Sequence, residues 1–317
     1  MISTLARGLV AGAAGTTVLN AVTYADVLWR GRAPSETPEQ VVDALAGRLA
    51  GGLPGRGAVR EHRRTALGAL SGIGTGLGVG VLASVLRAAG VRFSGPTGAV
   101  VAGAAAMAAT DGPVAALGVS DPRTWTAADW VADAVPHLAY GAAVQGVLSS
   151  VPVAREQRDR RTPAPPGLVL RSAVLGVATG GRSSLALAAP VLGDPGSRRG
   201  TRLGALAAVA GELVGDKLPA TPARTSAQAL PARLLGGAGA AGRIAGREGA
   251  NAAAPVTAGL LGALAGSFGG LAWRRWAATR VPDWQAALAE DAVAIGLAAL
   301  AARPGRRQRP QLSVVPS

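Results

Sequence analysis

The stretch TALGALSGIGTGLGVGVLASVL, residues 65–86, contains no charged residue and is followed by Arg87. A helix that crosses the hydrocarbon core of a bilayer needs about 20 consecutive apolar residues, and this stretch is long enough. Three further stretches without formal charge cover residues 8–25, 134–154 and 249–273. The repeated pattern predicts an all-α, polytopic, helical membrane protein.

The composition agrees with a membrane protein. Hydrophobic residues make up 49% of the 317 residues and charged residues only 16%, which is too little polarity for a soluble domain of this size. The net charge of +14 comes from arginines spread between the apolar stretches. This spread favours contact with the lipid bilayer and its anionic head groups over nucleic acid. Tryptophans stand at the ends of apolar segments, as interfacial anchors do; they are Trp29, Trp125, Trp130, Trp273, Trp276 and Trp284.

The N-terminal membrane half is predicted to cover residues 1–152, followed by a Pro/Arg-rich linker at 153–167. Residues 96–119 contain Asp111-Gly112-Pro113, a natural break, and are predicted to enter the membrane and return on the same side. The predicted spans of this half lie near residues 8–29, 65–86 and 129–151.

The C-terminal membrane half is predicted to cover residues 168–317. The glycine-rich residues 234–247 are not expected to cross. The predicted spans of this half lie near residues 168–192, 203–218, 252–273 and 284–302. With three spans in the first half, the total is about seven transmembrane helices.

The polar segment after the first span contains TPEQVVDALAGRLA, residues 37–50. Thr37 can cap a helix, Pro38 suits its first position, and Gln40 completes a capping box. The apolar side chains that share one face of this helix are Val41, Val42, Leu45 and Leu49. We predict an amphipathic helix that lies on the membrane surface.

Arginine placement predicts the orientation, because loops rich in Lys and Arg stay in the cytoplasm. With 96–119 not crossing, the arginine-rich residues 30–64 and 152–167 both lie in the cytoplasm, as does the C-terminal tail. The N-terminus is then outside. Arg7 before an apolar stretch resembles a signal peptide, but Thr16, Thr17 and Asn20 within that stretch favour an uncleaved first span.

Glycines at four-residue intervals mark one face of the predicted helix at 65–86: Gly68, Gly72, Gly76 and Gly80. A glycine face lets the backbone of a second helix approach closely. We expect helix packing within the chain, with self-association into a homo-oligomer as the alternative.

Ionisable residues within predicted spans cost about 2.5 to 3.5 kcal/mol each, so they are candidates for function. Glu212 and Asp216 lie one helical turn apart and need a cation or a shared proton between them. Arg182 is the candidate partner of Glu212, and Lys217 is the only lysine of the chain. The candidate residues of a solute or ion site are Arg182, Glu212, Asp216, Lys217, Asp133 and Asp291; Asp26 and Glu290 also fall in these spans.

No catalytic, cofactor or metal site is predicted, so we expect no enzyme. Leu213 stands where the Gly-x-Gly-Asp motif of intramembrane aspartyl proteases requires glycine, and no Gly-x-Ser-Gly motif of a serine protease is present. The chain has no cysteine, and its two histidines are His62 and His137, which excludes a His/Cys-rich metal site. We interpret His137, beside Pro136, as a packing group.

Three pieces of the C-terminal half carry a resemblance: TGGRSSLALAAPVL (179–192), GELVGDKLPATPART (211–225) and LPARLLGGAGAAGR (230–243). Together they resemble the uncharacterised bacterial integral-membrane family called domain of unknown function 4126, over about residues 168–302. The most specific match is a Glu-x-x-x-Asp-Lys-x-Pro core at Glu212, Asp216, Lys217 and Pro219, with Arg182 at the place of an early arginine. The resemblance implies a protein of the bacterial plasma (inner) membrane without an assigned activity. The N-terminal half matches no family securely.

From the charged residues themselves we expect a carrier or channel for a small solute or ion. The alternative is a non-catalytic membrane scaffold in which the same residues form structural ion pairs.

Overall fold

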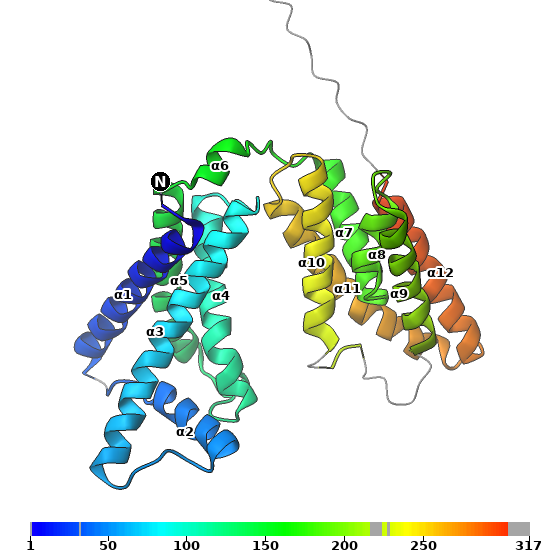
Figure 1. Cartoon of the computed structure of the whole chain (residues 1–317). Coiled ribbons are helices and arrows are strands. Elements are labelled where there is room, and N and C mark those ends of the chain that lie inside the picture. The colour runs from blue at the N-terminus through cyan, green and yellow to red at the C-terminus, as the bar shows by residue number, and fades with distance from the viewer. Residues whose placement is uncertain (1, 32, 216–223, 227–228, 304–317) are drawn as a thin grey trace, which may run out of the picture. The chain divides into compact units, whose positions relative to one another are not determined.

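The chain folds as helices in the computed structural model, which describes residues 2–31, 33–215, 224–226 and 229–303 (Figure 1). Within these residues the only β-type pairing is a single bridge between Thr162 and Ala250. The predicted all-α fold class is confirmed. The helices divide into two units, Met1–Asp159 (unit 1) and Arg160–Ser317 (unit 2).

Five of the described helices are long and apolar enough to cross a membrane. Large apolar side chains on these helices are exposed, such as Leu28 at 84% and Trp29 at 90%, and a few polar side chains are fully buried, among them Arg7, Ser84 and Ser267. Exposed apolar surface of this kind suits contact with lipid. With five such helices among the described residues, the predicted seven spans are not confirmed. The five helices are α1 (Thr4–Arg30), α3 (Ala58–Ala88), α4 (Gly95–Ala116), α11 (Ala253–Ala277) and α12 (Asp283–Ala301).

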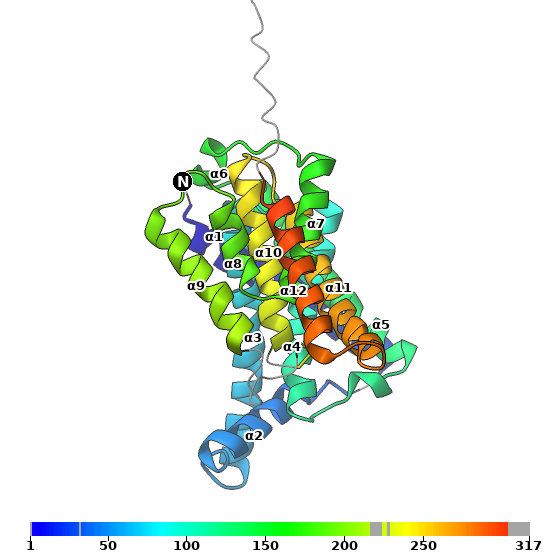
Figure 2. The same ribbon diagram turned by 90° about the vertical axis from the view of Figure 1, so that its right-hand side faces the viewer.

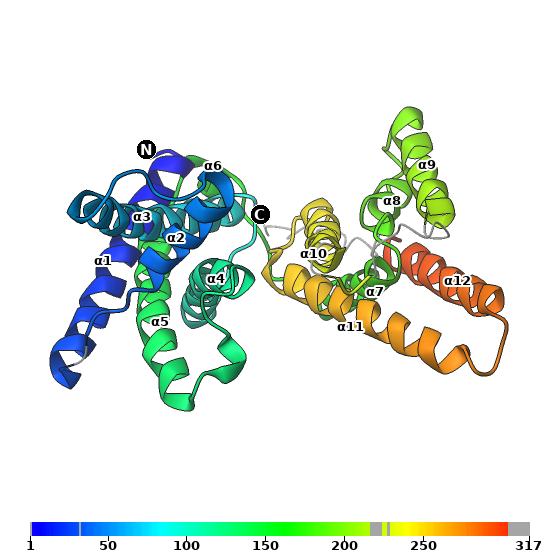
Figure 3. The same cartoon turned by 90° about the horizontal axis from the view of Figure 1, so that it is seen from below.

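Unit 1 is built from long antiparallel helices (Figures 1 and 3). α1 packs against α3 and against α5 (Ala127–Ser150), and α4 packs against α5. The 3₁₀-helix η1 (Pro122–Thr124) precedes α5, and the capping box that Thr126 forms with Asp129 fixes where α5 begins. The short helix α6 (Ala154–Arg158) follows α5 and belongs to unit 1. The predicted linker at 153–167 therefore contains a helix.

α4 contradicts the predicted re-entrant segment at 96–119. It is one continuous helix of 22 residues, about 33 Å long, which is enough to cross a bilayer. Asp111 and Gly112 lie inside it, and Pro113 is followed by only one more turn. A proline so close to the helix end removes one backbone hydrogen bond without breaking the helix.

α2 (Thr37–Ala50) has the bounds expected from the sequence. It is the blue helix beside the lower end of α3 in Figure 2. The predicted capping box is wrong, because Glu36 is the N-cap and no side chain caps the helix; Thr37 is already helical. Val42 is buried where α2 packs against α3, whereas Leu49 is 83% exposed. Part of the predicted apolar face therefore turns toward the protein and part toward the surroundings.

Unit 2 places α11 between two neighbours (Figure 3). α11 packs against α7 and α10, α12 packs against α7, and α9 packs against α8. The predicted non-crossing residues 234–247 are helical, and one face of this helix is buried, whereas Leu235 is 72% exposed. α10 contacts α11 through glycine on the buried face: a Cβ on Gly237 would lie 2.6 Å from the Gly259 carbonyl oxygen. The remaining helices of this unit are α7 (Pro166–Gly181), α8 (Leu185–Leu192), α9 (Arg199–Gly215) and α10 (Ala229–Arg247).

The predicted single span at 168–192 is wrong, since the helix is interrupted at residues 182–184. Arg182 ends α7 in an extended conformation, and α8 begins after Ser184. The chain reverses at the break, because Arg171 of α7 bonds the Arg303 carbonyl and Gly193 after α8 contacts Ala302. Both arms of this helical hairpin therefore approach the end of α12.

The predicted glycine face of α3 divides into four different environments. A Cβ on Gly80 would lie 2.5 Å from the Gly12 Cα of α1, and a Cβ on Gly76 would meet the Thr16 hydroxyl. Gly68 faces Glu39 of α2. Gly72 has nothing within 4 Å of an added Cβ among the described residues, so the expected packing within the chain is wrong there.

Candidate functional site

The break between α7 and α8 is surrounded by charged side chains from several helices of unit 2. Arg182, at the break, is buried, and its Nε donates to Asp291 Oδ1 of α12 at 2.6 Å. Arg182 Nη2 contacts the same oxygen. Asp291 lies near the middle of the 19 residues of α12, so this ion pair is far from both ends of that helix.

Glu212 of α9 caps the first turn of α8. Its Oε1 accepts hydrogen bonds from the Ser183 backbone N–H at 2.8 Å and the Ser183 hydroxyl at 2.6 Å. Its Oε2 accepts from the Ser184 backbone N–H at 2.8 Å. The first N–H groups of a helix have no partner within the helix and carry a partial positive charge, so a carboxylate is well placed there.

Arg233 of α10 caps the C-terminus of α7. Its Nη1 donates to the carbonyl oxygens of Gly180 and Gly181, at 3.0 and 3.1 Å. Those carbonyls lie at the C-terminus of α7, where a cation is favourable. Arg233 Nη2 also lies 3.8 Å from Glu212 Oε1, so one arginine and one glutamate stabilise the two helix ends that the break exposes.

A second ion pair lies one residue along α12. Glu290 is buried and pairs with Arg224, whose Nη2 donates to Glu290 Oε2 at 3.2 Å. A Cβ on Gly270 of α11 would meet this ion pair. The adjacent carboxylates of Glu290 and Asp291 therefore each have an arginine of their own.

The structure brings three predicted site residues of unit 2 together and corrects their pairing. Arg182, Glu212 and Asp291 all lie at the break, but the described ion pair of Arg182 is with Asp291; no Arg182–Glu212 pair occurs among the described residues. Asp216, Lys217 and Pro219 lie outside the described residues.

Sequence reasoning missed Arg233, Arg224 and the two serines of the break. Arg233 stands in LPARLLGG, directly before residues 234–247, which we predicted not to cross. Had a buried helix been predicted there, the cost of burying a charge would have marked Arg233 as a candidate. Ser183 and Ser184 follow Gly180-Gly181, and this run of poor helix formers is the local signal for a break.

Asp133 is a residue of α5 and belongs to unit 1. His137, one turn later, is buried, with Nδ1 3.4 Å from Asp133 Oδ1 and 2.8 Å from the Asp133 carbonyl oxygen. The Thr110 hydroxyl of α4 lies 3.3 Å from His137 Nε2. All the described residues at the helix break belong to unit 2, so Asp133 is not one of them. Asp26, another candidate, pairs with Arg30 at the exposed end of α1.

Unit 1 also contains a buried ion cluster that we did not predict. Arg7 is fully buried, and its Nη2 lies 2.6 Å from Glu156 Oε1 of α6. Arg7 Nε donates to the Ser84 hydroxyl at 3.0 Å, and Arg87 Nε lies 3.3 Å from Glu156 Oε2. These contacts tie the beginning of α1 and the end of α3 to α6. The sequence signal was weak, because Arg7 and Glu156 lie outside the apolar stretches.

The guanidinium groups, N–H groups and carboxylates at the break can recognise charged groups. Guanidinium groups and helix N–H groups bind anions, and carboxylates bind cations or protons. Among the described residues, no three His, Cys, Asp or Glu side chains are grouped so that they could hold a metal ion.

Comparison with known proteins gave no similar protein: no family model matches the chain, and no curated protein or solved structure matches it. The resemblance to domain of unknown function 4126 therefore stays a prediction.

Proposed function

We propose that this protein is a membrane carrier or channel for a small solute or ion, which meets charged side chains at the break between α7 and α8. The observation that carries the proposal is the convergence of charged residues from α9, α10 and α12 on an interrupted helix. Charged residues within membrane helices usually mark substrate or ion pathways. Interrupted helices with exposed ends are the usual binding sites of secondary transporters.

The expected depth of the site in the bilayer supports the same proposal. Asp291 lies near the middle of a helix that is long and apolar enough to cross a membrane. Transporters place substrate and coupling-ion sites near the bilayer midplane. Glu212 and Asp291 are the candidate groups for a cation or proton, and Arg182 and Arg233 are those for an anion.

The second candidate is a membrane scaffold, and it is favoured by how fully the cluster is paired. The Glu212 carboxylate accepts three hydrogen bonds, and Asp291 and Glu290 each bind an arginine. Removing one partner of a buried pair costs about 3 to 5 kcal/mol, so such pairs can be retained for stability and specificity alone.

Flux through proteoliposomes tests the two candidates. The purified chain is reconstituted, and the movement of H⁺, Na⁺, K⁺, Cl⁻ and small charged solutes is followed with trapped indicators. The double variant Arg182→Gln/Asp291→Asn removes both charges of one pair without stranding either. We expect it to fold and to reduce flux by at least about tenfold, the effect of about 1.4 kcal/mol.

The matched control is Arg274→Gln/Asp283→Asn, which removes an ion pair whose Asp283 side chain is 80% exposed. This variant should retain the flux of the natural chain. Absence of flux of every ion and solute through the natural chain would favour the scaffold, and a double variant less stable than the natural chain would support it further.

We further propose that the protein resides in the bacterial plasma membrane with its C-terminal tail in the cytoplasm. The five apolar helices support residence in a membrane, and the four arginines at positions 303, 306, 307 and 309 support a cytoplasmic tail. The number of crossings beyond these five depends on α5 and on α7 to α10, which are not among the five.

A further inference from the structure

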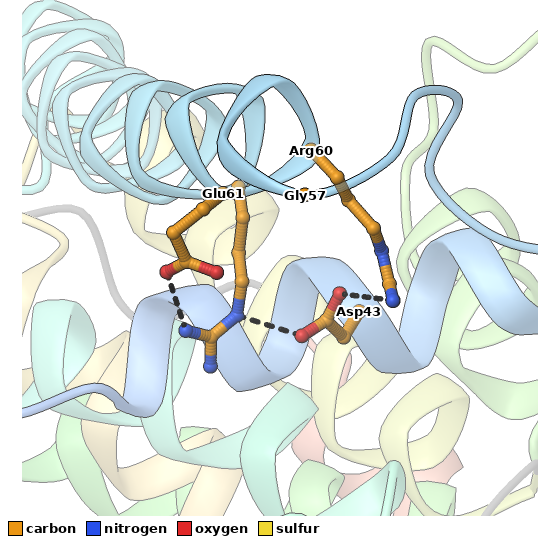
Figure 4. Close-up of a pocket in the computed structure, with 5 residues that line it drawn as sticks. Asp43, Gly57, Arg60 and Glu61 are labelled. Carbon is orange, nitrogen blue, oxygen red and sulfur yellow. Dashed lines mark hydrogen bonds and ion pairs between the residues drawn. The ribbon is translucent and has the colours of Figure 1, made fainter.

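A small charged cavity lies where α2 crosses the beginning of α3 (Figure 4). Its volume is about 360 Å³, and it is lined by Asp43 of α2 and by Gly57, Arg60, Glu61 and Arg64 at the start of α3. Ligand pockets of proteins usually measure about 300 to 1,000 Å³, so this cavity suits a small ligand or the head group of a larger one.

The cavity presents both signs of charge. Asp43 lies between two arginines, accepting from Arg64 Nε at 2.7 Å and from Arg60 Nη2 at 3.3 Å. Arg64 also donates to Glu61 at 3.2 Å. With two guanidinium groups and two carboxylates the lining is electrically balanced, so a purely anionic or purely cationic ligand would meet repulsion as well as attraction.

Two of these groups have capacity left for a ligand. The Arg60 side chain is 52% exposed, and its one described side-chain hydrogen bond uses one of the five donors of a guanidinium. The Glu61 side chain is 60% exposed. In addition, α3 begins at Ala58 without a side-chain cap, so the first N–H groups of the helix beside the cavity favour an anion such as phosphate.

The cavity also lies at the level of lipid head groups. α3 has 31 residues and is about 46 Å long, whereas the hydrocarbon core is about 30 Å thick. The apolar stretch of α3 starts at Thr65, so residues 57–64 project beyond the hydrocarbon. Leu45 and Leu49 of α2 are exposed at this end of unit 1, as expected of a helix that rests on the membrane surface.

We propose that this cavity binds the head group of a zwitterionic phospholipid that carries a primary amine, a phosphoethanolamine group. The phosphate would take hydrogen bonds from Arg60 and from the first turn of α3, and the ammonium would donate to Glu61. The acyl chains would lie along the apolar part of α3. This inference does not depend on the proposed transport activity.

Native mass spectrometry of the full chain in mixed micelles tests the proposal, with phosphatidylethanolamine and phosphatidylglycerol as the added lipids. We expect phosphatidylethanolamine to bind about tenfold more tightly than phosphatidylglycerol, a difference of about 1.4 kcal/mol. Arg60→Gln should weaken phosphatidylethanolamine binding about tenfold. Arg56→Gln, in the loop directly before α3 and outside the cavity lining, should leave it unchanged. Glu61→Gln should remove the preference between the two lipids.

Helix content and melting temperature are measured for each variant, and little change is expected, because the side chains of the Arg60–Asp43 pair are 52% and 32% exposed and such partly exposed pairs contribute little. Equal or tighter binding of phosphatidylglycerol by the natural chain would overturn the proposal. So would equal binding by the Arg60→Gln and Arg56→Gln variants. Soluble phosphoethanolamine and inorganic phosphate serve as competitors. Displacement of the lipid by either compound at a concentration comparable to that of the lipid would assign the cavity to a soluble ligand and overturn its role as a lipid site.

Discussion

The side chains at the helix break follow a simple rule: each buried charge meets either an opposite charge or the end of a helix. Glu212 binds N–H groups at the start of α8, Arg233 binds carbonyls at the end of α7, and Arg182 pairs with Asp291. In a medium without water an interrupted helix is tolerated only when such partners satisfy the freed backbone groups. The charges and the break are therefore mutually dependent.

At the residue scale we predict that Arg182 is coupled to Asp291 more strongly than to Glu212. In double-mutant cycles with Arg182→Gln, Asp291→Asn should give a coupling energy of about 1 to 3 kcal/mol, because the two side chains are in direct contact. The cycle with Glu212→Gln should give a smaller value, since Glu212 bonds mainly to Ser183 and Ser184. Melting temperatures in detergent supply the measurement. A larger coupling with Glu212 would contradict the pairing.

At the scale of helices, glycine decides which surfaces meet. α1 and α3 approach at Gly12 and Gly80, and α10 and α11 approach at Gly237 and Gly259. Because lipid is as apolar as leucine, helix association in a membrane depends on such close packing. The same residue type facing open space, as at Gly72, contributes no contact among the described residues.

We predict that Gly80→Leu destabilises the protein strongly, because the added side chain would overlap the backbone of α1; overpacking costs about 1 to 3 kcal/mol or more. Gly72→Leu, two turns earlier on the same helix, is the matched control and should leave the melting temperature nearly unchanged. Equal changes of melting temperature in the two variants would show that Gly80 does not pack against α1. A shift of oligomeric state in Gly72→Leu alone would show that this glycine packs against a second chain.

At the scale of unit 1, the order of its helices determines which loops lie at the same end of the unit, and hence on the same side of the membrane. The contacts of Arg7 with Glu156 and the Val151 carbonyl place the start of α1 beside the end of α5. The contact of Arg48 with the Leu117 carbonyl places α2 at the other end of α4. With α4 continuous, the arginine-rich residues 30–64 and the α6 region lie at opposite ends of this unit, contrary to the expectation that both face the cytoplasm.

Single introduced cysteines test this topology, because the natural chain has none. We predict that Ser35→Cys and Gln157→Cys react oppositely with an impermeant thiol reagent in intact cells, one being labelled and the other protected. A cysteine at Gly52 should behave as the one at Ser35 does, which makes it the internal control. The same response at positions 35 and 157 would mean that the helices of unit 1 do not all cross.

The sequence alone determined the fold class and singled out several charged residues that the structure places at the helix break. Apolar stretches of bilayer length and tryptophans at their ends are local signals, so they predicted membrane helices without knowledge of packing. The bounds of α2 followed from local signals as well, although its cap did not. Arg182, Glu212 and Asp291 were recognised because a charge in a membrane helix is expensive wherever its partner lies.

Only the tertiary structure decided how these parts combine. Spacing along a helix shows which residues share a face, but not which helix lies opposite, so the partner of Arg182 and the open side of Gly72 were not predictable. The break at residues 182–184 depends on partners from α9 and α10, which are distant in sequence. Conversely, Asp111-Gly112-Pro113 has every local sign of a break, yet α4 continues, because it ends only one turn later and its one lost hydrogen bond is a small part of the helix.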